Sequence, residues 1–146
     1  MASSNPSPSP DREYDLVLFG ASSFVGKLTA EYLAGAAPSD LKVALAGRSK
    51  QKLEKVRAGL PAPADQWPIM LADSDDEESI AKMAGSARVV VTTVGPYLKY
   101  GLPLVLACAE AGTDYADLTG EALFVRRSID QAHETATKNG ARIVHS

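Results

Sequence analysis

The chain has 146 residues, of which 45% are hydrophobic and 23% are charged, a composition typical of one ordinary globular domain. Its formal net charge of −3, without a dense basic run, argues against nucleic acid as the main partner. No apolar run approaches the roughly 18 residues that a membrane-spanning helix needs, and the N-terminal region lacks the pattern of a signal peptide. We therefore expect a cytoplasmic protein without a transmembrane segment.

The first residues differ in composition from the rest. Residues 1–11 are rich in Ser and Pro and have little to bury, so we expect a disordered tail there and one domain over residues 12–146. That domain begins with a short apolar strand, Asp15–Phe19, and a glycine-containing turn follows at once. Apolar residues then recur at the spacing of an amphipathic helix that Gly35 ends: Val25, Leu28, Tyr32 and Leu33.

The alternation of strand and helix continues to the end of the chain. Further strands are predicted over residues 41–46, 67–72, 88–94, 115–118 and 142–145. Further helices are predicted over residues 50–60, 102–111 and 121–138, and Ser74 is expected to cap another helix ahead of the acidic residues 75–78. Because crossovers are right-handed, this pattern predicts an α/β fold with a doubly wound, mostly parallel sheet. Its six strands match the dinucleotide-binding Rossmann fold, whose usual strand order is 3-2-1-4-5-6.

The turn after the first strand can bind a phosphate. Gly20 lets the chain turn sharply, Gly26 lets the helix pack closely on the sheet, and free backbone N–H groups converge with the positive end of the helix. Ser23 stands where the usual pattern has its middle glycine, although its hydroxyl can itself donate to a phosphate oxygen. We predict a pyrophosphate site here, against the alternative of a purely structural turn, formed by Gly20, Ser22, Ser23, Phe24, Val25 and Gly26.

A nucleotide triphosphate site of the P-loop type does not fit the same turn. Gly26-Lys27 would end such a loop, but Ala21 stands where its first glycine belongs. Leu28 also replaces the hydroxyl that would bind magnesium. We therefore exclude triphosphate hydrolysis.

The end of the second strand predicts which dinucleotide binds. About 20 residues beyond the turn, an Asp or Glu would bind the ribose of NAD, whereas an Arg suits the 2′-phosphate of NADP. This place is held by Arg48, with Ser49 beside it and Lys50 and Lys52 close by. Since a guanidinium binds phosphate through two donors, NADP(H) is favoured over NAD(H). The alternative is a solvated basic start to the next helix.

Two other strand ends supply candidate cofactor residues. Asp73 follows the third strand and either borders the adenine or caps the next helix. The residues that end the fourth strand lie at the crevice where the strand order reverses: Thr93, Val94, Gly95, Pro96 and Tyr97. Gly95 would let the backbone lie against the cofactor, and Tyr97 would shelve the nicotinamide or donate a proton. An ordinary strand-ending turn is the alternative.

The remaining reactive side chains are assigned structural roles. Cys108 lies in an apolar helical pattern, which predicts a buried thiol and agrees with a reducing cytoplasm. His133 falls among polar helical residues and His145 at the end of the chain. These positions give no reason to expect a zinc site or a Ser-His-Asp arrangement, and they identify no catalytic residue.

Four motifs together resemble a known family. Residues 14–26 (YDLVLFGASSFVG), 46–49 (AGRS), 93–97 (TVGPY) and 114–121 (DYADLTGE) are similar to the saccharopine dehydrogenase-like oxidoreductases, and most of all to the trans-acting enoyl reductases among them. The resemblance runs from Arg12 to Ser146. It implies an NADP(H)-binding Rossmann domain and hydride delivery to an enoyl thioester. It also implies lipid metabolism and a polyketide synthase as partner.

The chain departs from that family in two places. Family members usually have Thr-Gly where this chain has Ser22-Ser23. They also continue beyond the sixth strand into a substrate domain, which we expect to be absent here, so that the chain alone turns over little. The helix over residues 102–111 is apolar nearly all round, which predicts a homo-oligomer in which a second copy covers its outer face.

Overall fold

A computed structural model of the chain describes residues 11–146, so most of the expected N-terminal tail lies outside the described residues. The strands are β1 Tyr14–Phe19, β2 Val43–Gly47, β3 Ile69–Leu71, β4 Ala87–Thr92, β5 Asp114–Ala116 and β6 Ile143–Val144. The α-helices are α1 Phe24–Ala36, α2 Lys50–Ala58, α3 Glu77–Ser86, α4 Tyr97–Tyr100, α5 Leu102–Ala111 and α6 Ala122–Asn139. A short 3-10 helix, Ala64–Gln66, precedes β3.

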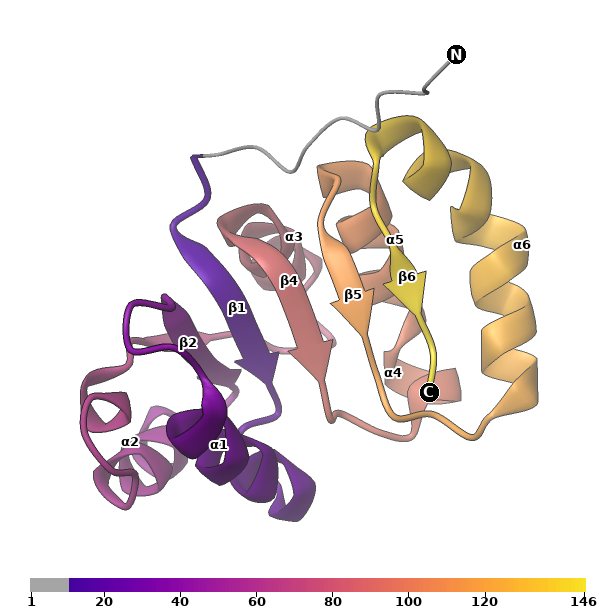
Figure 1. Ribbon diagram of the computed structural model, residues 1–146. Coiled ribbons are helices and arrows are strands. Elements are labelled where there is room, and N and C mark those ends of the chain that lie inside the picture. The colour runs from indigo at the N-terminus through magenta and orange to yellow at the C-terminus, as the bar shows by residue number, and fades with distance from the viewer. Residues whose placement is uncertain (1–10) are drawn as a thin grey trace.

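All six strands are parallel and lie in the order β3-β2-β1-β4-β5-β6 (Figure 1). This confirms the predicted α/β fold and its strand order. The sequence order reverses between β1 and β4, whose register has five partner pairs, from Tyr14 with Ala87 to Phe19 with Thr92. The carboxyl ends of the strands therefore meet at one edge of the sheet, beside the switch point where such folds bind their ligands.

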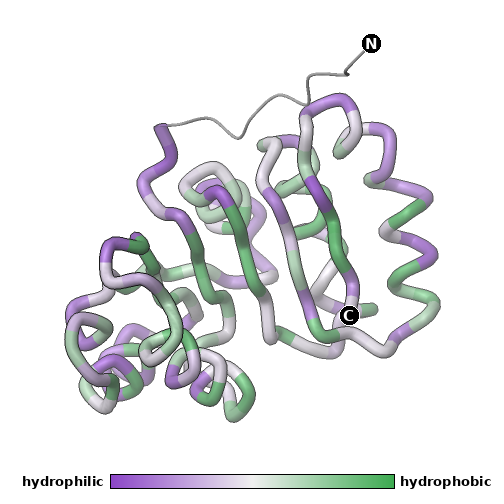
Figure 2. The backbone as a smooth tube through the Cα atoms, viewed as in Figure 1, coloured by the Kyte–Doolittle hydropathy of each residue, from purple (hydrophilic) through white to green (hydrophobic). Residues whose placement is uncertain are grey.

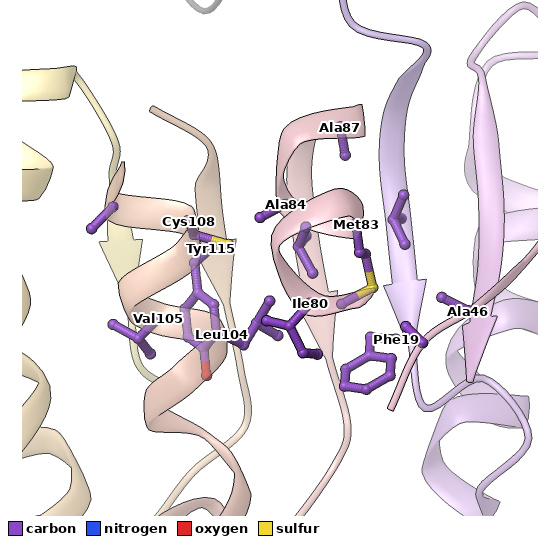
Figure 3. Close-up of a cluster of buried hydrophobic side chains, with 14 of the residues drawn as sticks. Phe19, Ala46, Ile80, Met83, Ala84, Ala87, Leu104, Val105, Cys108 and Tyr115 are labelled. Atoms are coloured by element: carbon purple, nitrogen blue, oxygen red, sulfur yellow. The ribbon is translucent and has the colours of Figure 1, made fainter. Parts of the chain in front are cut away.

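Helices cover both faces because alternate residues of each strand point to opposite sides. In β1, Val17 and Phe19 pack with α3, α5 and α6, whereas Leu18 packs with α1 and α2. Figure 2 shows the resulting hydrophobic strands, and Figure 3 shows Ile80 and Met83 of α3 beside Phe19. Burying each such large side chain contributes on the order of 1.5–3 kcal/mol. The sheet is thus packed on both faces, and its strand ends are held in place at the edge where a ligand would bind.

Helix α5 differs from the prediction that a second copy covers it. It packs against both α3 and α6 within the same chain, and Leu104, Val105 and Cys108 are buried there. Only Pro103 and Glu110 of the helix are exposed. Its apolar composition is therefore explained by two neighbours in one chain, and α5 gives no support to a homo-oligomer.

Helix α1 buries small residues, and of the apolar residues that its sequence pattern suggests, Leu33 packs against the core as a partly buried side chain. Gly26 and Ala30 are buried, while Phe24, Leu28 and Tyr32 are 79%, 51% and 72% exposed. The helix also continues past Gly35 to Ala36. Proline disfavours the helical conformation in the residue before it, so Pro38 rather than Gly35 sets the end of the helix.

Arg12 joins the C-terminal ends of two helices. Its guanidinium donates to the carbonyl oxygens of Ala84 and Gly85 at the end of α3, and to that of Ala111 at the end of α5. Carbonyl groups in the last turn of a helix lack intrahelical partners, and the negative end of the helix dipole favours a cation there. The first residues of the domain thus stabilise the layer that covers one face of the sheet.

Within residues 11–146, no helix has the length and apolar character needed to cross a bilayer.

Candidate functional site

A cavity of about 360 Å³ lies at the carboxyl edge of the sheet. It is bordered by the ends of β1, β2, β3 and β4, the four strands around the switch point. Its lining residues are Phe19, Gly20, Ser22, Ser23, Gly47, Arg48, Ser49, Lys52, Asp73, Ser74, Asp75, Thr93, Val94, Gly95 and Tyr100. The cavity therefore brings together residues from all four strand ends that the sequence singled out.

Two glycines shape the turn between β1 and α1. Gly20 has a φ of +83°, and a Cβ atom there would lie 2.7 Å from Thr93 Oγ1 and 2.8 Å from Val94 Cγ2. A Cβ atom on Gly26 would lie 2.0 Å from the carbonyl oxygen of Gly20. Only glycine fits at either position, because the turn lies against the β4 loop on one side and α1 presses on it from the other. Gly26 packs the helix and does not line the cavity.

Ser23 serves as the N-cap of α1. Its hydroxyl oxygen accepts a hydrogen bond from the backbone N–H of Gly26 at 3.0 Å and lies 2.8 Å from the carbonyl oxygen of Gly20, to which it donates. It also lies 3.2 Å from Thr93 Oγ1. The side chain that replaces the usual middle glycine is thus folded back onto its own turn, where it satisfies one of the unpaired N–H groups of the helix.

The N-terminus of α1 keeps two amides free for an anion. Of the first-turn amides, that of Gly26 is used by Ser23, while no hydrogen bond within residues 11–146 uses those of Phe24 and Val25. The side chains of Phe24 and Val25 are exposed and neither residue lines the cavity, so these two residues can contribute through their backbone amides. The N-terminus of this 13-residue helix is suited to a pyrophosphate.

Positive charge lies at the β2 end of the cavity. Arg48 is exposed and lines the cavity together with Ser49 and Lys52. Ser49 caps α2, because its hydroxyl accepts from the backbone N–H of Lys52 at 3.4 Å. Two cations and a helix N-terminus therefore meet at one end of the cavity, a donor set suited to a phosphate monoester. Lys52 belongs to this set, although from its sequence position we expected only that it would lie close to Arg48.

The β3 end of the cavity is acidic. Asp73 lines the cavity, and its carboxylate accepts from the backbone N–H of Asp75 at 3.0 Å, which makes a turn rather than a helix cap. The predicted cap at Ser74 is wrong: Asp76 caps α3, with its carboxylate accepting from the amides of Glu78 and Ser79 at 3.1 and 3.3 Å. Ser74 and Asp75 do not cap the helix and instead line the cavity. There, hydroxyl and carboxylate oxygens can accept hydrogen bonds from an amino group or from sugar hydroxyls.

The residues after β4 differ in location, because some line the cavity and others lie in the core. Thr93, Val94 and Gly95 line the cavity, whereas Pro96 and Tyr97 do not. The ring of Tyr97 is buried and stacks on Phe124 at 5.7 Å, its hydroxyl donates to the carbonyl oxygen of Thr92 at 3.0 Å, and burial raises its pKa. The structure thus places the side chain of Tyr97 in the core and not in the lining of the cavity.

Tyr100 is the aromatic residue of this segment that does line the cavity. It ends α4, and the Lys99 ammonium lies 5.0 Å from the centre of its ring. The sequence does not predict α4, because four residues are too few to show a helical period. The signal that could have revealed it is the pair of tyrosines three residues apart, on one face of a single helical turn.

A buried network of polar side chains lies beyond β5. It corrects the expectation that the chain has no Ser-His-Asp arrangement. Asp117 Oδ2 accepts from the Tyr115 hydroxyl at 2.7 Å and lies 2.6 Å from His145 Nδ1, while His145 Nε2 lies 2.8 Å from Ser128 Oγ. Asp, His and Ser are therefore aligned after all. Ser128 is only 2% exposed on α6, which is typical of a structural hydroxyl rather than of a nucleophile. The network ties the ends of β5 and β6 to α6.

The residues of the cavity fit NADP(H). The free amides at the N-terminus of α1 match a pyrophosphate, and the glycine cradle lets it approach the backbone. Arg48, Ser49 and Lys52 match the 2′-phosphate that distinguishes NADP from NAD. Contacts between the cofactor and individual residues stay predictions, of which those at Gly20, Ser22, Ser23, Arg48, Ser49, Asp73, Thr93, Val94 and Gly95 concern residues that line the cavity.

Sequence relatives and solved structures agree with this geometry. A candidate trans-acting enoyl reductase of Mycobacterium tuberculosis is 60% identical over 135 residues, and the trans-acting enoyl reductase of Mycobacterium leprae is 57% identical over 137 residues. These matches cover 92% and 93% of this chain but 32% of each relative. The chain therefore spans about a third of the length of the curated relatives that it matches.

Two solved structures share the fold at low identity. The apo saccharopine dehydrogenase (L-Glu forming) of Saccharomyces cerevisiae matches with a TM-score of 0.69 and 19% identity, over 90% of this chain and 26% of that one. The triphenylmethane reductase of Citrobacter sp., in complex with NADP(H), matches with a TM-score of 0.65 and 15% identity, over 90% and 48% of the two chains.

A family model described as the saccharopine dehydrogenase NADP binding domain matches residues 16–144, which is nearly the whole part of the chain that the structure describes. This confirms the resemblance seen in the four motifs and the preference for NADP(H) that Arg48 predicted. The chain belongs to the family of saccharopine dehydrogenase NADP-binding domains.

Proposed function

We propose that this chain is the cofactor-binding part of an oxidoreductase that reduces the carbon–carbon double bond of an enoyl thioester with NADPH. Its high identity to trans-acting enoyl reductases supports this activity, and the activity belongs to relatives about three times as long. The observation that carries the proposal is a single cavity with helix amides at one end and Arg48, Ser49 and Lys52 at another. That distribution matches the two phosphate groups by which NADPH is recognised.

The chain's share of the reaction is binding and orientation. When bound, NADPH supplies the hydride. The α1 amides hold the pyrophosphate, the β2 end selects the 2′-phosphate, and the β4 segment around Gly95 borders the cofactor where the strand order reverses. Tyr97 is turned into the core, so its hydroxyl does not serve as the proton donor. We assign protonation of the substrate to the part of the relatives that this chain does not match.

The finer assignments follow the family resemblance. We propose a polyketide intermediate as the thioester, a polyketide synthase as partner, complex-lipid synthesis as the process and the cytoplasm as the compartment. The support for them is the word "trans-acting" in the names of the relatives, together with the motif resemblance. A competing proposal is a non-catalytic module that keeps the fold and either senses a nucleotide or binds nothing.

Calorimetric titration with NADPH and NADH separates these proposals. We expect NADPH to bind at least about tenfold more tightly than NADH, because only its 2′-phosphate can form charge-assisted hydrogen bonds with Arg48. Arg48→Ala should remove that preference and leave NADH binding unchanged. Arg127→Ala, which removes an exposed arginine of α6, is the matched control. Absence of binding by either nucleotide would favour a non-catalytic module.

A further inference from the structure

The motif over residues 114–121 makes a contact that the cofactor cavity itself does not explain. Glu121 precedes α6, and its two carboxylate oxygens accept hydrogen bonds from two successive amides of another element. Oε2 accepts from the backbone N–H of Tyr97 at 2.6 Å, and Oε1 accepts from that of Leu98 at 3.2 Å. These are the first two amides of α4, which the sequence places 24 and 23 residues away.

Helix α4 depends on this carboxylate for its cap. The first amides of a helix have no intrahelical partner, and a side chain at the N-cap usually satisfies them. The N-cap of α4 is Pro96, whose side chain forms no cap hydrogen bond. Glu121 takes that role from a distant loop, and an anion at a helix N-terminus is also favoured by the dipole of the peptide groups.

The loop that carries Glu121 is itself fixed to the sheet. Asp117 follows β5, and its Oδ1 accepts from the backbone N–H of Thr119 at 3.0 Å. The hydroxyl oxygen of Thr119 accepts in turn from the backbone N–H of Glu121 at 3.1 Å. Two successive turns therefore fix the position of the Glu121 carboxylate relative to β5. Asp117 and Thr119 of this motif each contribute a hydrogen bond to these turns.

The segment held by Glu121 forms a wall of the cofactor cavity. Gly95 and Tyr100 line the cavity on either side of the two capped amides in the sequence. The side chain of Tyr97 is anchored in the core through its hydroxyl bond to Thr92 and its stacking on Phe124. The Tyr97 ring thus holds the segment through its contacts in the core, and Glu121 holds the backbone of the segment from the loop after β5.

We infer that Glu121 is a positioning residue for the cofactor, which acts by holding the segment from Gly95 to Tyr100 in the conformation that forms the cavity wall. This inference rests on the proposed function, in that the cavity takes NADP(H). Glu121 does not line the cavity, so it acts through the backbone that it caps and not through contact with the nucleotide.

Two substitutions test this role at a temperature where circular dichroism shows each variant folded. Glu121→Ala removes both acceptors and should raise the Kd for NADPH about tenfold, since a bond to a charged acceptor contributes appreciably to local order. Glu121→Gln keeps one acceptor oxygen and should give an intermediate Kd. Glu134→Ala, which removes an exposed glutamate within α6, should bind NADPH as the wild type does. A role confined to stability would leave the Kd of the folded variants unchanged.

Hydrogen exchange provides a readout that does not depend on the cofactor. The amides of Tyr97 and Leu98 should exchange faster in Glu121→Ala than in the wild type, while amides of β4 keep their protection. A folded Glu121→Ala variant with wild-type NADPH affinity, or with unchanged exchange at both amides, would overturn the inference. If the wild-type chain binds no NADPH, the proposed function fails, and the exchange of these two amides alone decides whether Glu121 holds the segment.

Discussion

The Ser23 hydroxyl accepts a hydrogen bond from the backbone N–H of Gly26 at 3.0 Å, which makes a residue of the phosphate turn the cap of the helix that follows it. The side chain therefore belongs to the helix more than to the cavity. This relationship accounts for a serine at the place where dinucleotide-binding turns usually have a glycine, because the cap compensates for the less open approach to the backbone.

Replacement of Ser23 should change stability more than cofactor affinity. Ser23→Ala removes the cap and should lower the free energy of unfolding by about 1 kcal/mol, whereas Ser23→Gly should lower it by only a few tenths. The Kd for NADPH should change less than about threefold in both variants, a difference of well under 1 kcal/mol. Urea denaturation and calorimetric titration measure the two quantities. Loss of NADPH binding in Ser23→Ala at unchanged stability would show that the hydroxyl binds the cofactor directly.

Gly20→Ala should destabilise the turn severely. The backbone has a φ of +83° there, and the added methyl group would lie 2.7 Å from Thr93 Oγ1 and 2.8 Å from Val94 Cγ2. The left-handed conformation alone costs an L-residue about 1–2 kcal/mol, and the steric clash adds to it. Gly35→Ala is the control, because a Cβ atom there meets nothing within 4 Å and should stabilise the helix by about 0.5–1 kcal/mol. Urea denaturation of both variants should show opposite signs, and equal effects would contradict this account of the turn.

Arg12→Ala should destabilise the domain although Arg12 lies far from the cavity. The guanidinium donates to carbonyl oxygens at the ends of α3 and α5, and hydrogen bonds that involve a charged group contribute about 1.5–3 kcal/mol each at most. Arg126→Ala breaks an exposed pair with Asp130 inside one helix and should have no measurable effect. Thermal unfolding monitored by circular dichroism separates the two variants. A lowered Tm for both, or for neither, would be inconsistent with the bridge between helices.

Stability should fall at alkaline pH because of buried acids that are neutral in the folded chain. Burial raises the pKa of the Cys108 thiol from 9.0 to about 12, and burial together with the hydrogen bond to Asp117 also raises the pKa of Tyr115. The unfolded chain therefore loses these protons at lower pH than the folded chain does. Their contribution to stability is fully present below the unfolded pKa and is lost as pH rises from about 9 towards 12.

The alkaline effect can be assigned to the thiol with one variant. Urea denaturation at pH values from about 7 to about 11 should show a smaller decline in Cys108→Ala than in the wild type, whatever the variant's stability at neutral pH. The thiol should also react with a disulfide reagent only after denaturant is added, because Cys108 is fully buried. Rapid reaction of the native thiol would contradict its burial against α3 and α6.

The fold followed from local patterns that agree with one another. The alternation of strands and helices, the order of the six strands and the turn between β1 and α1 all appear where the sequence indicated. Helix α1 departed from its pattern because its contact with the turn is too close for large side chains. Periodicity reports which side chains share a face, but not how near that face comes to its neighbour.

The residues of the candidate site were predictable where they directly follow a strand in the sequence. They were less predictable where residues far apart in the sequence come into contact. Arg48 and Gly95 follow strands directly, and both line the cavity. Tyr100 lies on a single helical turn, and the contact of Asp117 with His145 joins residues 28 apart in the sequence. The contact of Asp117 with His145 has no local signal, because a hydrogen bond between strand ends depends on the register of the finished sheet. The local signal for Tyr100 is weak, since it consists of two tyrosines three residues apart on one helical turn.

The most direct measurement is a crystal structure of the chain grown with NADPH. We expect the pyrophosphate on the amides of Phe24 and Val25 at the start of α1, and the 2′-phosphate within hydrogen-bond distance of the Arg48 guanidinium. A cofactor bound elsewhere, or a cavity that holds only solvent at saturating NADPH, would contradict this expectation.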